Sequence, residues 1–314
     1  MRVRKAVFPV AGFGTRFLPA TKSVPKEMLP VVDKPVIQYA VEEARAAGIE
    51  KCIFVTSRDK AALEDHFDRS PELEDALLCR GKLKIHREVE ALVRESGTVV
   101  SVRQNEPLGM GHAVWCAREI VGNEPFAVIL PDDLLHPRTA DGRSVEPVLK
   151  QMVTRFARVQ SSMAAVMEVA QDQTGKYGIL DPAGEADADG LVPVRGLVEK
   201  PPPSEAPSRL AIIGRYILTP EIFNLLARHR RGTGGEIQLT DAMAALMGTQ
   251  KLYGYRFEGT RYDCGDKSGF QMGNMALALE REEFRPRLLA FMEEQLAFWK
   301  RQLQPPPPSG GSGS

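Results

Sequence analysis

The first 132 residues alternate short apolar runs with helix-like segments, and this alternation constrains the fold more than any other feature. The apolar runs have the length and composition of buried strands, and they lie at residues 5–11, 51–57, 98–104 and 125–131. The helix-like segments between them lie at residues 35–48, 59–67 and 111–121. Such alternation is typical of a parallel sheet covered by helices. The sequence therefore predicts an α/β fold with a Rossmann-like, mostly parallel twisted sheet and helices on both faces.

The chain has 314 residues, which is long enough to bury a sizeable core. We expect a single domain over residues 1–303, with a helical insertion near 71–97 and C-terminal helices over 267–302. Residues 304–314 read QPPPPSGGSGS, a composition typical of a disordered tail. The helical segment 285–302 either packs on its own domain or contacts another protomer.

Charge and cysteine content exclude several classes of function. The chain has 41 basic and 41 acidic side chains, a balance that indicates neither a nucleic-acid nor a membrane-surface partner. Its four cysteines form no C-x-x-C pair, which argues against a zinc site or a disulfide framework. The first apolar run is too short for a signal peptide, and no window approaches the roughly 18 apolar residues of a membrane span. We therefore expect a cytoplasmic protein.

A glycine-rich loop follows the first predicted strand and contains the segment AGFGTRF at residues 11–17. Glycine lets backbone N–H groups approach anionic oxygens closely, as phosphate-binding loops require. The Walker A pattern is absent, and Phe17 occupies the place of the third glycine of the dinucleotide fingerprint. Arg16 and Lys26 follow, separated by two stiffening prolines. The loop is either a tight strand–helix turn or a cradle for a triphosphate, and the two cations favour the cradle.

Polar residues at the predicted strand ends point to one shared site. The glycine-rich loop, Gln104 and Asp132 each follow a predicted strand. The carboxyl ends of parallel strands meet at one edge of a sheet, where ligands of such folds bind. We therefore expect these three features to lie at the same edge.

Several motifs, in order along the chain, resemble those of one known family. The segment AGFGTRFLPATKSVPKEMLP at residues 11–30 resembles the signature of the sugar-1-phosphate nucleotidylyltransferases. The later segments GHAVWCA, VILPDD, VEKP, GRYIL, GEIQLTDA and DCGDK look like the bacterial UTP–glucose-1-phosphate uridylyltransferase branch of that family. The resemblance runs from about residue 3 to residue 290 and implies a nucleotide-diphospho-sugar transferase fold.

The reaction that this resemblance implies is uridylyl transfer from UTP to glucose 1-phosphate, giving UDP-glucose and pyrophosphate, with Mg²⁺ as the cofactor. Two alternatives stay open: the same chemistry with dTTP or CTP, and a non-catalytic regulatory paralogue. We also expect a homo-oligomer, either a dimer or a tetramer.

The resemblance also implies roles for individual residues. Arg16 would clamp the β- and γ-phosphates, and Lys26 would neutralise the α-phosphate. The residues expected to bind the nucleotide are Ala11, Gly12, Gly14, Thr15, Glu27, Gln104 and Gly109. The residues expected to bind the sugar phosphate are Gly178, Glu199 and Lys200.

Two carboxylates are the expected Mg²⁺ ligands, namely Asp132 and Asp263. The adjacent Asp133 and the nearby Asp266 stay open as substitutes, because the sequence does not show which carboxylate points inward. Asp266 is also a departure from the family pattern, since relatives often carry Asn there. His112 opens a predicted helix, so a capping or packing role is expected rather than a general base.

Overall fold

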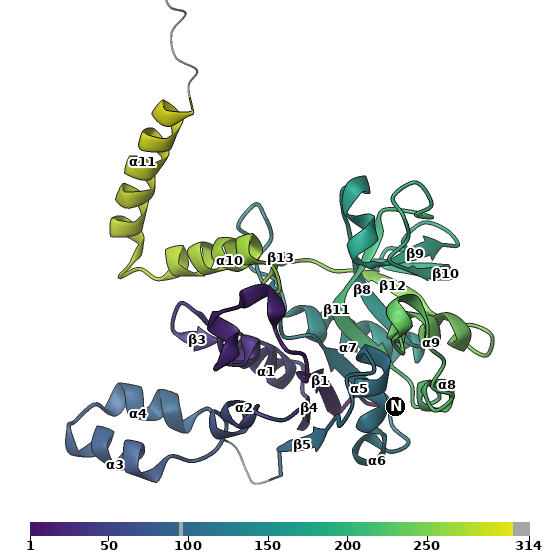
Figure 1. Cartoon of the computed structure of the whole chain (residues 1–314), viewed down its shortest axis with the longest axis horizontal. Helices are drawn as coiled ribbons and strands as arrows, with labels where there is room; N and C mark the ends of the chain where they lie inside the picture. The colour runs from purple at the N-terminus through teal and green to yellow at the C-terminus, as the bar shows by residue number, and fades with distance from the viewer. Residues whose placement is uncertain (94–96, 304–314) are drawn as a thin grey trace, which may run out of the picture.

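The computed structural model describes residues 1–93 and 97–303 and is built around a nine-stranded sheet (Figure 1). The strand order is β5-β4-β1-β6-β11-β8-β12-β10-β9, and β9 also pairs with β11. The strands are β1 (Lys5–Pro9), β4 (Lys51–Thr56), β5 (Val99–Arg103), β6 (Phe126–Ile129), β8 (Met163–Glu168), β9 (Gly178–Pro182), β10 (Leu191–Glu199), β11 (Leu210–Leu218) and β12 (Tyr253–Arg256). The remaining strands form two two-stranded sheets. One pairs β2 (Pro30–Val31) with β3 (Lys34–Pro35), and the other pairs β7 (Asp133–His136) with β13 (Thr260–Asp263).

Helices cover both faces of the main sheet, as the sequence predicts (Figure 1). One face carries α1 (Val36–Ala46), α2 (Ala61–Asp65) and α7 (Val148–Val159). The other carries α5 (Met110–Cys116), α6 (Arg118–Val121), α8 (Ile222–Leu226) and α9 (Leu239–Leu246). Three-residue 3-10 turns lie at Thr15–Phe17, Ala20–Lys22, Lys26–Met28 and Thr233–Gly235, and a longer one lies at Gln171–Lys176.

The alternation of side chains along β1 divides the core between these two faces. Ala6 and Phe8 pack in one cluster with Ile37 of α1, whereas Val7 packs in the other with Val114 of α5. All five side chains are almost completely buried. A strand whose successive side chains point to opposite faces must be apolar on both sides when both faces are covered. This is why the predicted strands read as continuous apolar runs.

The prediction of a mostly parallel sheet is wrong for its second half. The pairs β4–β5, β1–β4, β1–β6 and β8–β12 are parallel. The pairs β6–β11, β8–β11, β9–β10, β9–β11 and β10–β12 are antiparallel. Strands β9, β10 and β11 follow one another through loops without an intervening α-helix, and parallel pairing needs a long crossover. The fold is therefore α/β with a mixed sheet.

The predicted helical insertion corresponds to α3 (Pro71–Cys79) and α4 (Leu83–Glu90). Its residues 94–96, like the predicted disordered tail at 304–314, lie outside the described residues. The predicted C-terminal helices are α10 (Lys267–Glu280) and α11 (Arg285–Gln302). Among the described helices, none is both long and apolar enough to span a membrane.

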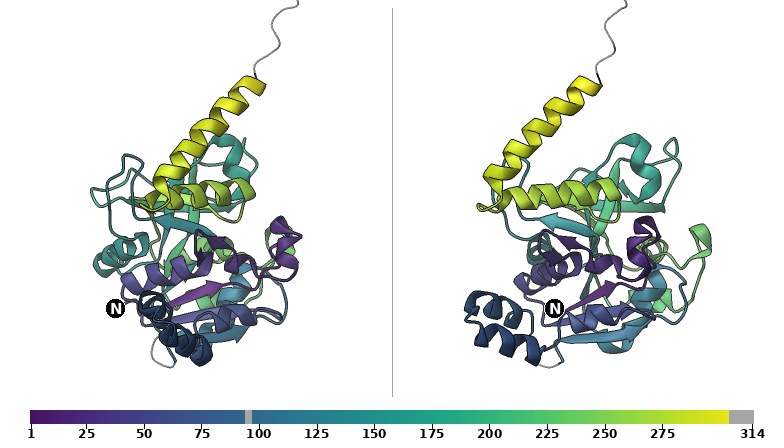
Figure 2. Two further views of the ribbon diagram at one scale, coloured as in Figure 1. Left: turned by 90° about the vertical axis from the view of Figure 1, so that its left-hand side faces the viewer. Right: turned by 60° about the vertical axis from the view of Figure 1, so that its left-hand side comes forward.

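Helix α11 extends away from the rest of the molecule (Figure 2). In the described structure none of its residues is buried, and Leu296 and Trp299 are each 56% exposed. Of the two roles expected for this segment, packing on its own domain is therefore not the one observed. Contact with another protomer stays a prediction.

Candidate active site

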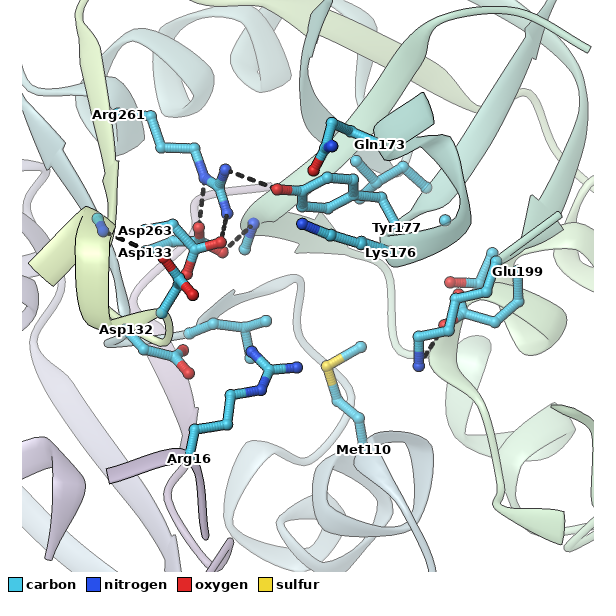
Figure 3. Close-up of a pocket in the computed structure, with 18 of the residues that line it drawn as sticks. Arg16, Met110, Asp132, Asp133, Gln173, Lys176, Tyr177, Glu199, Arg261 and Asp263 are labelled. Atoms are coloured by element: carbon cyan, nitrogen blue, oxygen red, sulfur yellow. Dashed lines mark hydrogen bonds and ion pairs between the residues drawn. The ribbon is translucent and has the colours of Figure 1, made fainter. Parts of the chain in front are cut away.

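An open cavity of about 810 Å³ lies beyond the carboxyl end of β6, where the sequence places the site (Figure 3). Six of the predicted site residues line it, namely Arg16, Asp132, Gly178, Glu199, Lys200 and Asp263. They come from segments more than 240 residues apart in the chain, between position 16 and position 263. The fold thus brings Arg16 and the predicted metal and sugar residues to one cavity. Lys26 and the predicted nucleotide-binding residues are not among the residues that line it.

The glycine-rich loop packs closely against the segment that carries Lys26. Gly14 has a φ of 66°, and a Cβ built on it would lie 3.0 Å from Cβ of Lys26. Thr21 Oγ1 donates a hydrogen bond of 2.7 Å to the Gly14 carbonyl. A side chain at position 14 would therefore push Lys26 outward, and glycine also tolerates the left-handed backbone. Gly14 acts in this structure by placing Lys26.

The other loop residues differ in how much space surrounds them. The carbonyl of Ala11 accepts a hydrogen bond of 3.0 Å from Ser57 Oγ. Apart from Gly12 and its two neighbours in the chain, no described residue has an atom within 4 Å of the point where a Cβ on Gly12 would stand. Thr15 begins the 3-10 turn that carries Arg16, whose Nη1 donates to the Gly265 carbonyl at 3.4 Å. The loop is thus fixed at both ends and open at Gly12.

Lys26 and Asp132 form an ion pair at the edge of the cavity. Lys26 Nζ lies 2.5 Å from Asp132 Oδ2. Burial alone would lower the pKa of Lys26, but the charges of Asp132 and Glu27 outweigh it and hold that pKa above its ordinary value. Burial would likewise raise the pKa of Asp132, but Lys26 outweighs it and the pKa lies below its ordinary value. Both groups are therefore charged at neutral pH.

The four candidate metal-binding carboxylates differ in their contacts. A Cβ built on Gly265 would lie 3.1 Å from both Asp132 Oδ2 and Asp263 Oδ1, so these carboxylates flank one bare glycine. Asp133 instead pairs with Arg261 and accepts a hydrogen bond of 3.0 Å from the Gly214 N–H. Asp263 also pairs with Arg261, and its Oδ1 accepts a hydrogen bond of 3.0 Å from the Gly265 N–H, so the two carboxylates share one cation.

Asp266 caps a helix. Its side chain accepts hydrogen bonds from the backbone N–H groups of Ser268 and Gly269, at 3.1 Å and 3.2 Å. An N-terminal cap of this kind satisfies backbone donors that have no partner inside the helix. Asn caps a helix equally well, so the departure at this position leaves the local structure intact.

Glu199 lies across the cavity from the aspartates (Figure 3), and Lys200, the next residue, lines the same cavity. Lys200 has a left-handed φ of 48°, and its Nζ lies 3.3 Å from Glu199 Oε1. This turn at the end of β10 lets both side chains line the cavity, although successive residues of a strand face opposite ways. A Cβ on Gly178 would lie 2.9 Å from Thr240 Oγ1 and 3.1 Å from Glu199 Oε2. Glycine at position 178 thus leaves room for the Glu199 carboxylate.

Gln104 and Gly109 are the first and last residues of the loop that joins β5 to α5. Gln104 Nε2 donates to the Gly109 carbonyl at 3.1 Å. Gly109 has a φ of 103°, and a Cβ on it would lie 2.7 Å from Cβ of Glu236 and 2.9 Å from the Ile237 carbonyl oxygen. Position 109 therefore excludes any side chain and keeps its backbone bare.

Glu27 lies behind the loop rather than on its open side. It is 2% exposed, and its Oε2 accepts a hydrogen bond of 2.7 Å from Lys60 Nζ. Its Oε1 is buried without a hydrogen-bond partner in the described structure. Burial raises the pKa of Glu27, and the charge of Lys60 offsets part of that effect. This arrangement gives the predicted base-reading role of Glu27 no support.

Residues 5–280 match the model of the family described as Nucleotidyl transferase. The chain belongs to the nucleotidyl transferase family. It is 49% identical over 292 residues to a UTP–glucose-1-phosphate uridylyltransferase of Bacillus subtilis, covering 93% of this chain and 97% of the relative. It is 51% identical over 265 residues to the enzyme of that name from Komagataeibacter xylinus, covering 84% of this chain and 90% of the relative.

A solved structure agrees with these matches. The structure of a UTP-bound UGPase from Acinetobacter baumannii superposes with a TM-score of 0.84 at 42% sequence identity. The superposition covers 93% of this chain and 99% of the other. The resemblance drawn from the sequence motifs is therefore confirmed over most of the chain.

The sequence motifs did not single out one cation of this nucleotidyl transferase. The Arg261 side chain is 9% exposed and pairs with Asp133 and Asp263, the latter at 3.1 Å. Its Nη1 donates a hydrogen bond of 3.2 Å to Tyr177 Oη (Figure 3). Arg261 stands two residues before Asp263 in β13, so both side chains face the same way. An arginine two residues before a predicted metal ligand is the sequence feature that could have indicated Arg261 as a site residue.

The donor set fits a hard divalent cation that also binds substrate phosphates. In the described residues no three His, Cys, Asp or Glu side chains converge on one point. Mg²⁺ is commonly bound through one or two carboxylates together with substrate phosphates and water. The Asp132 and Asp263 oxygens on either side of Gly265 match that pattern.

Proposed function

We infer that this nucleotidyl transferase transfers a uridylyl group from UTP to glucose 1-phosphate and releases pyrophosphate. The observation that carries this conclusion is the shared cavity, in which Arg16, Asp132 and Asp263 face Glu199 and Lys200. The 49% identity to a relative of that name, over 97% of its length, supports the same reaction. The product is UDP-glucose.

The chemistry is an in-line displacement at the α-phosphorus. A phosphate oxygen of glucose 1-phosphate forms the new bond to phosphorus while the bond to the β-phosphate oxygen breaks, and pyrophosphate leaves with that electron pair. Both reactants are anions, so positioning and charge neutralisation supply nearly all of the catalysis. A direct displacement of this kind needs no covalent intermediate with the protein.

The site residues divide this work between two sides of the cavity. Lys26 carries its charge at the edge where the α-phosphate is expected, and Arg16 presents a planar fork for the β- and γ-phosphates. Lys200 is placed to hold the sugar phosphate, and Glu199 to accept hydrogen bonds from neighbouring sugar hydroxyls. Asp132 and Asp263 would hold Mg²⁺, which when bound neutralises phosphate charge and orients the phosphate oxygens.

Base recognition falls to Gln104 and the bare backbone at Gly109. The Acinetobacter baumannii relative whose structure is described as UTP-bound supports UTP as the nucleotide substrate. The same scaffold with dTTP or CTP is the second candidate, because an added methyl group changes binding by only about 1–3 kcal/mol. A regulatory paralogue is disfavoured, since it would not be expected to keep Arg16, Lys26 and both aspartates.

One experiment tests this function directly. Pyrophosphate release is measured with glucose 1-phosphate and each of UTP, dTTP, CTP and ATP, with and without Mg²⁺. The highest kcat/KM is expected with UTP in the presence of Mg²⁺. Equal or faster turnover with another nucleotide would reassign the substrate, and no turnover with any of them would favour the regulatory paralogue.

We also propose that the chain assembles with further copies of itself in the cytoplasm. Helix α11 carries Leu289, Met292, Leu296 and Trp299, and Leu303 follows its last residue; the five are spaced alternately by three and four residues. That spacing is typical of helices that pack against another helix. A second copy of the chain is therefore the proposed partner.

A further inference from the structure

Contacts around Gln104 fix which end of its side-chain amide faces outward. Gln104 is 8% exposed, and its Nε2 lies 3.1 Å from the Gly109 carbonyl oxygen and 3.1 Å from His112 Nδ1. A carbonyl can only accept a hydrogen bond, so the NH₂ group of the amide must be the end that faces Gly109. Both N–H groups are then used. Among the hydrogen bonds of the described residues, none has Gln104 Oε1 as its acceptor.

The same contacts fix the protonation of His112. Because Gln104 donates to Nδ1, that nitrogen carries a lone pair and the ring proton sits on Nε2. Nε2 faces Cys116 Sγ at 3.9 Å, a weak acceptor. Burial and the neighbouring His229 lower the pKa of His112, whereas the charge of Glu106 and the interaction of the ring with the Glu106 backbone carbonyl raise it and are outweighed. The neutral ring is thus the form that this packing favours.

We propose that His112 is a positioning residue that sets base specificity, by locking the Gln104 amide with Oε1 turned toward the nucleotide base. This proposal rests on the function proposed above and on Gln104 as the residue that reads the base. An accepting oxygen matches the N3–H of uracil. Cytosine has a lone pair at N3, so two acceptors would face each other. The lock therefore favours UTP over CTP, and it does not distinguish UTP from dTTP, since thymine also has an N3–H.

The hydrogen bond from Gln104 to His112 also predicts that UTP affinity depends on pH. A proton on Nδ1 would face the NH₂ group of Gln104, and two donors would then oppose each other. The amide would have to rotate and turn its NH₂ group toward the base, so affinity for UTP should fall as His112 becomes protonated. His229, Glu106 and Cys116 are the titratable groups that influence or touch His112 in the described structure.

Two substitutions distinguish the effect of losing the hydrogen-bond acceptor at Nδ1 from the effect of losing the imidazole ring. His112→Leu removes the acceptor, whereas His112→Asn offers an amide oxygen near the position of Nδ1. Initial rates with UTP, dTTP and CTP are measured at saturating glucose 1-phosphate, with thermal unfolding to check the fold. His112→Leu should lower the UTP-to-CTP ratio of kcat/KM at least tenfold and leave the UTP-to-dTTP ratio and the KM for glucose 1-phosphate unchanged. His112→Asn and the control Cys116→Ala should keep the UTP-to-CTP ratio within threefold of wild type.

A measurement on the wild-type protein makes the proposal independent of whether the variants fold. The ¹⁵N chemical shifts of the His112 ring report its tautomer, and the form with the proton on Nε2 is expected at pH 7. An Nδ1–H tautomer, a charged ring at pH 7, or an unchanged UTP-to-CTP ratio in a folded His112→Leu protein would overturn the proposal. Failure of the wild-type protein to make UDP-glucose from UTP would instead overturn the proposed function, and the tautomer could still be read.

Discussion

Lys26 Nζ lies 2.5 Å from Asp132 Oδ2, so the cation that we place on the α-phosphate is already bound to a carboxylate that we place on the metal. In this state each charge neutralises the other. With substrate bound, Lys26 would pair with a phosphate in place of Asp132, and the Asp132 carboxylate would be available to hold Mg²⁺. The ion pair therefore keeps both groups charged.

The first prediction concerns Lys26. Lys26→Ala should lower kcat at least tenfold, a loss of about 1.4 kcal/mol of transition-state stabilisation. The same change frees Asp132, so Mn²⁺ should bind the nucleotide-free protein at least as tightly as it binds wild type, as measured by electron paramagnetic resonance. The exposed Lys22 in the same loop provides a control, since Lys22→Ala should change neither quantity. A near-wild-type kcat at saturating substrates would contradict the assignment of Lys26.

The second prediction separates the candidate metal ligands. Asp132→Asn should raise the Mg²⁺ concentration needed for half-maximal activity at least tenfold, because a neutral amide is a poor ligand for Mg²⁺. Asp266→Asn is the matched control, since Asn also caps a helix and the metal requirement should stay the same. Activity is titrated with Mg²⁺ after treatment with EDTA. If the two variants titrate alike, the metal role assigned to Asp132 is wrong.

Much of the fold could be predicted because local sequence and tertiary environment agree there. Strand β1 is apolar on both faces, so the run Ala6, Val7 and Phe8 predicts a strand buried in the centre of the sheet. Strand direction in the second half could not be predicted in the same way. An apolar run such as that around Ile213 looks the same in a parallel and in an antiparallel sheet, and only the connections decide its direction.

In the site too, residues that belong to local motifs could be predicted, whereas contacts that depend on tertiary packing could not. Arg16, Asp132 and Glu199 follow predicted strands or stand at their ends, and the cavity contains all three. The burial of Glu27 against Lys60 depends on how the segment 58–60 packs under the loop, and no spacing in the sequence reveals it. The contact between Gln104 and His112 is similar, since it joins a strand end to a helix eight residues later.

The third prediction tests the sugar side of the cavity. Glu199→Ala should raise the KM for glucose 1-phosphate at least tenfold and leave UTP affinity nearly unchanged. The reason is that a charged hydrogen-bond acceptor contributes roughly 1.5–3 kcal/mol per bond. UTP binding is measured by calorimetry and the sugar KM by initial rates, with the exposed Glu205→Ala as a control. A parallel loss of both affinities would mean that Glu199 supports the fold, and a loss of neither would move the sugar site elsewhere.

The fourth prediction uses the open space above Gly12. No described atom would touch a Cβ there, so Gly12→Ala should keep or raise thermal stability, by at most about 0.4–1 kcal/mol. The methyl group would instead enter the space expected for the nucleotide, and the KM for UTP should rise at least tenfold. Gly109→Ala provides the contrast, because its Cβ would lie 2.7 Å from Cβ of Glu236 and should lower the unfolding temperature. A stable Gly12→Ala protein with unchanged UTP affinity would remove Gly12 from the binding site.

The fifth prediction concerns the exposed helix α11. Leu296 and Trp299 are each 56% exposed on a helix with no buried residue in the described structure. The double substitution Leu296→Glu with Trp299→Glu should reduce the mass of the assembly in solution, because a carboxylate is costly to bury in an apolar interface. Light scattering coupled to size exclusion measures that mass, and Glu294→Gln on the same helix is the control. The active site lies on the main body, so kcat/KM per chain should stay within threefold of wild type. An unchanged mass in the double variant would place any protomer contact elsewhere, and a monomeric wild type would remove the proposal.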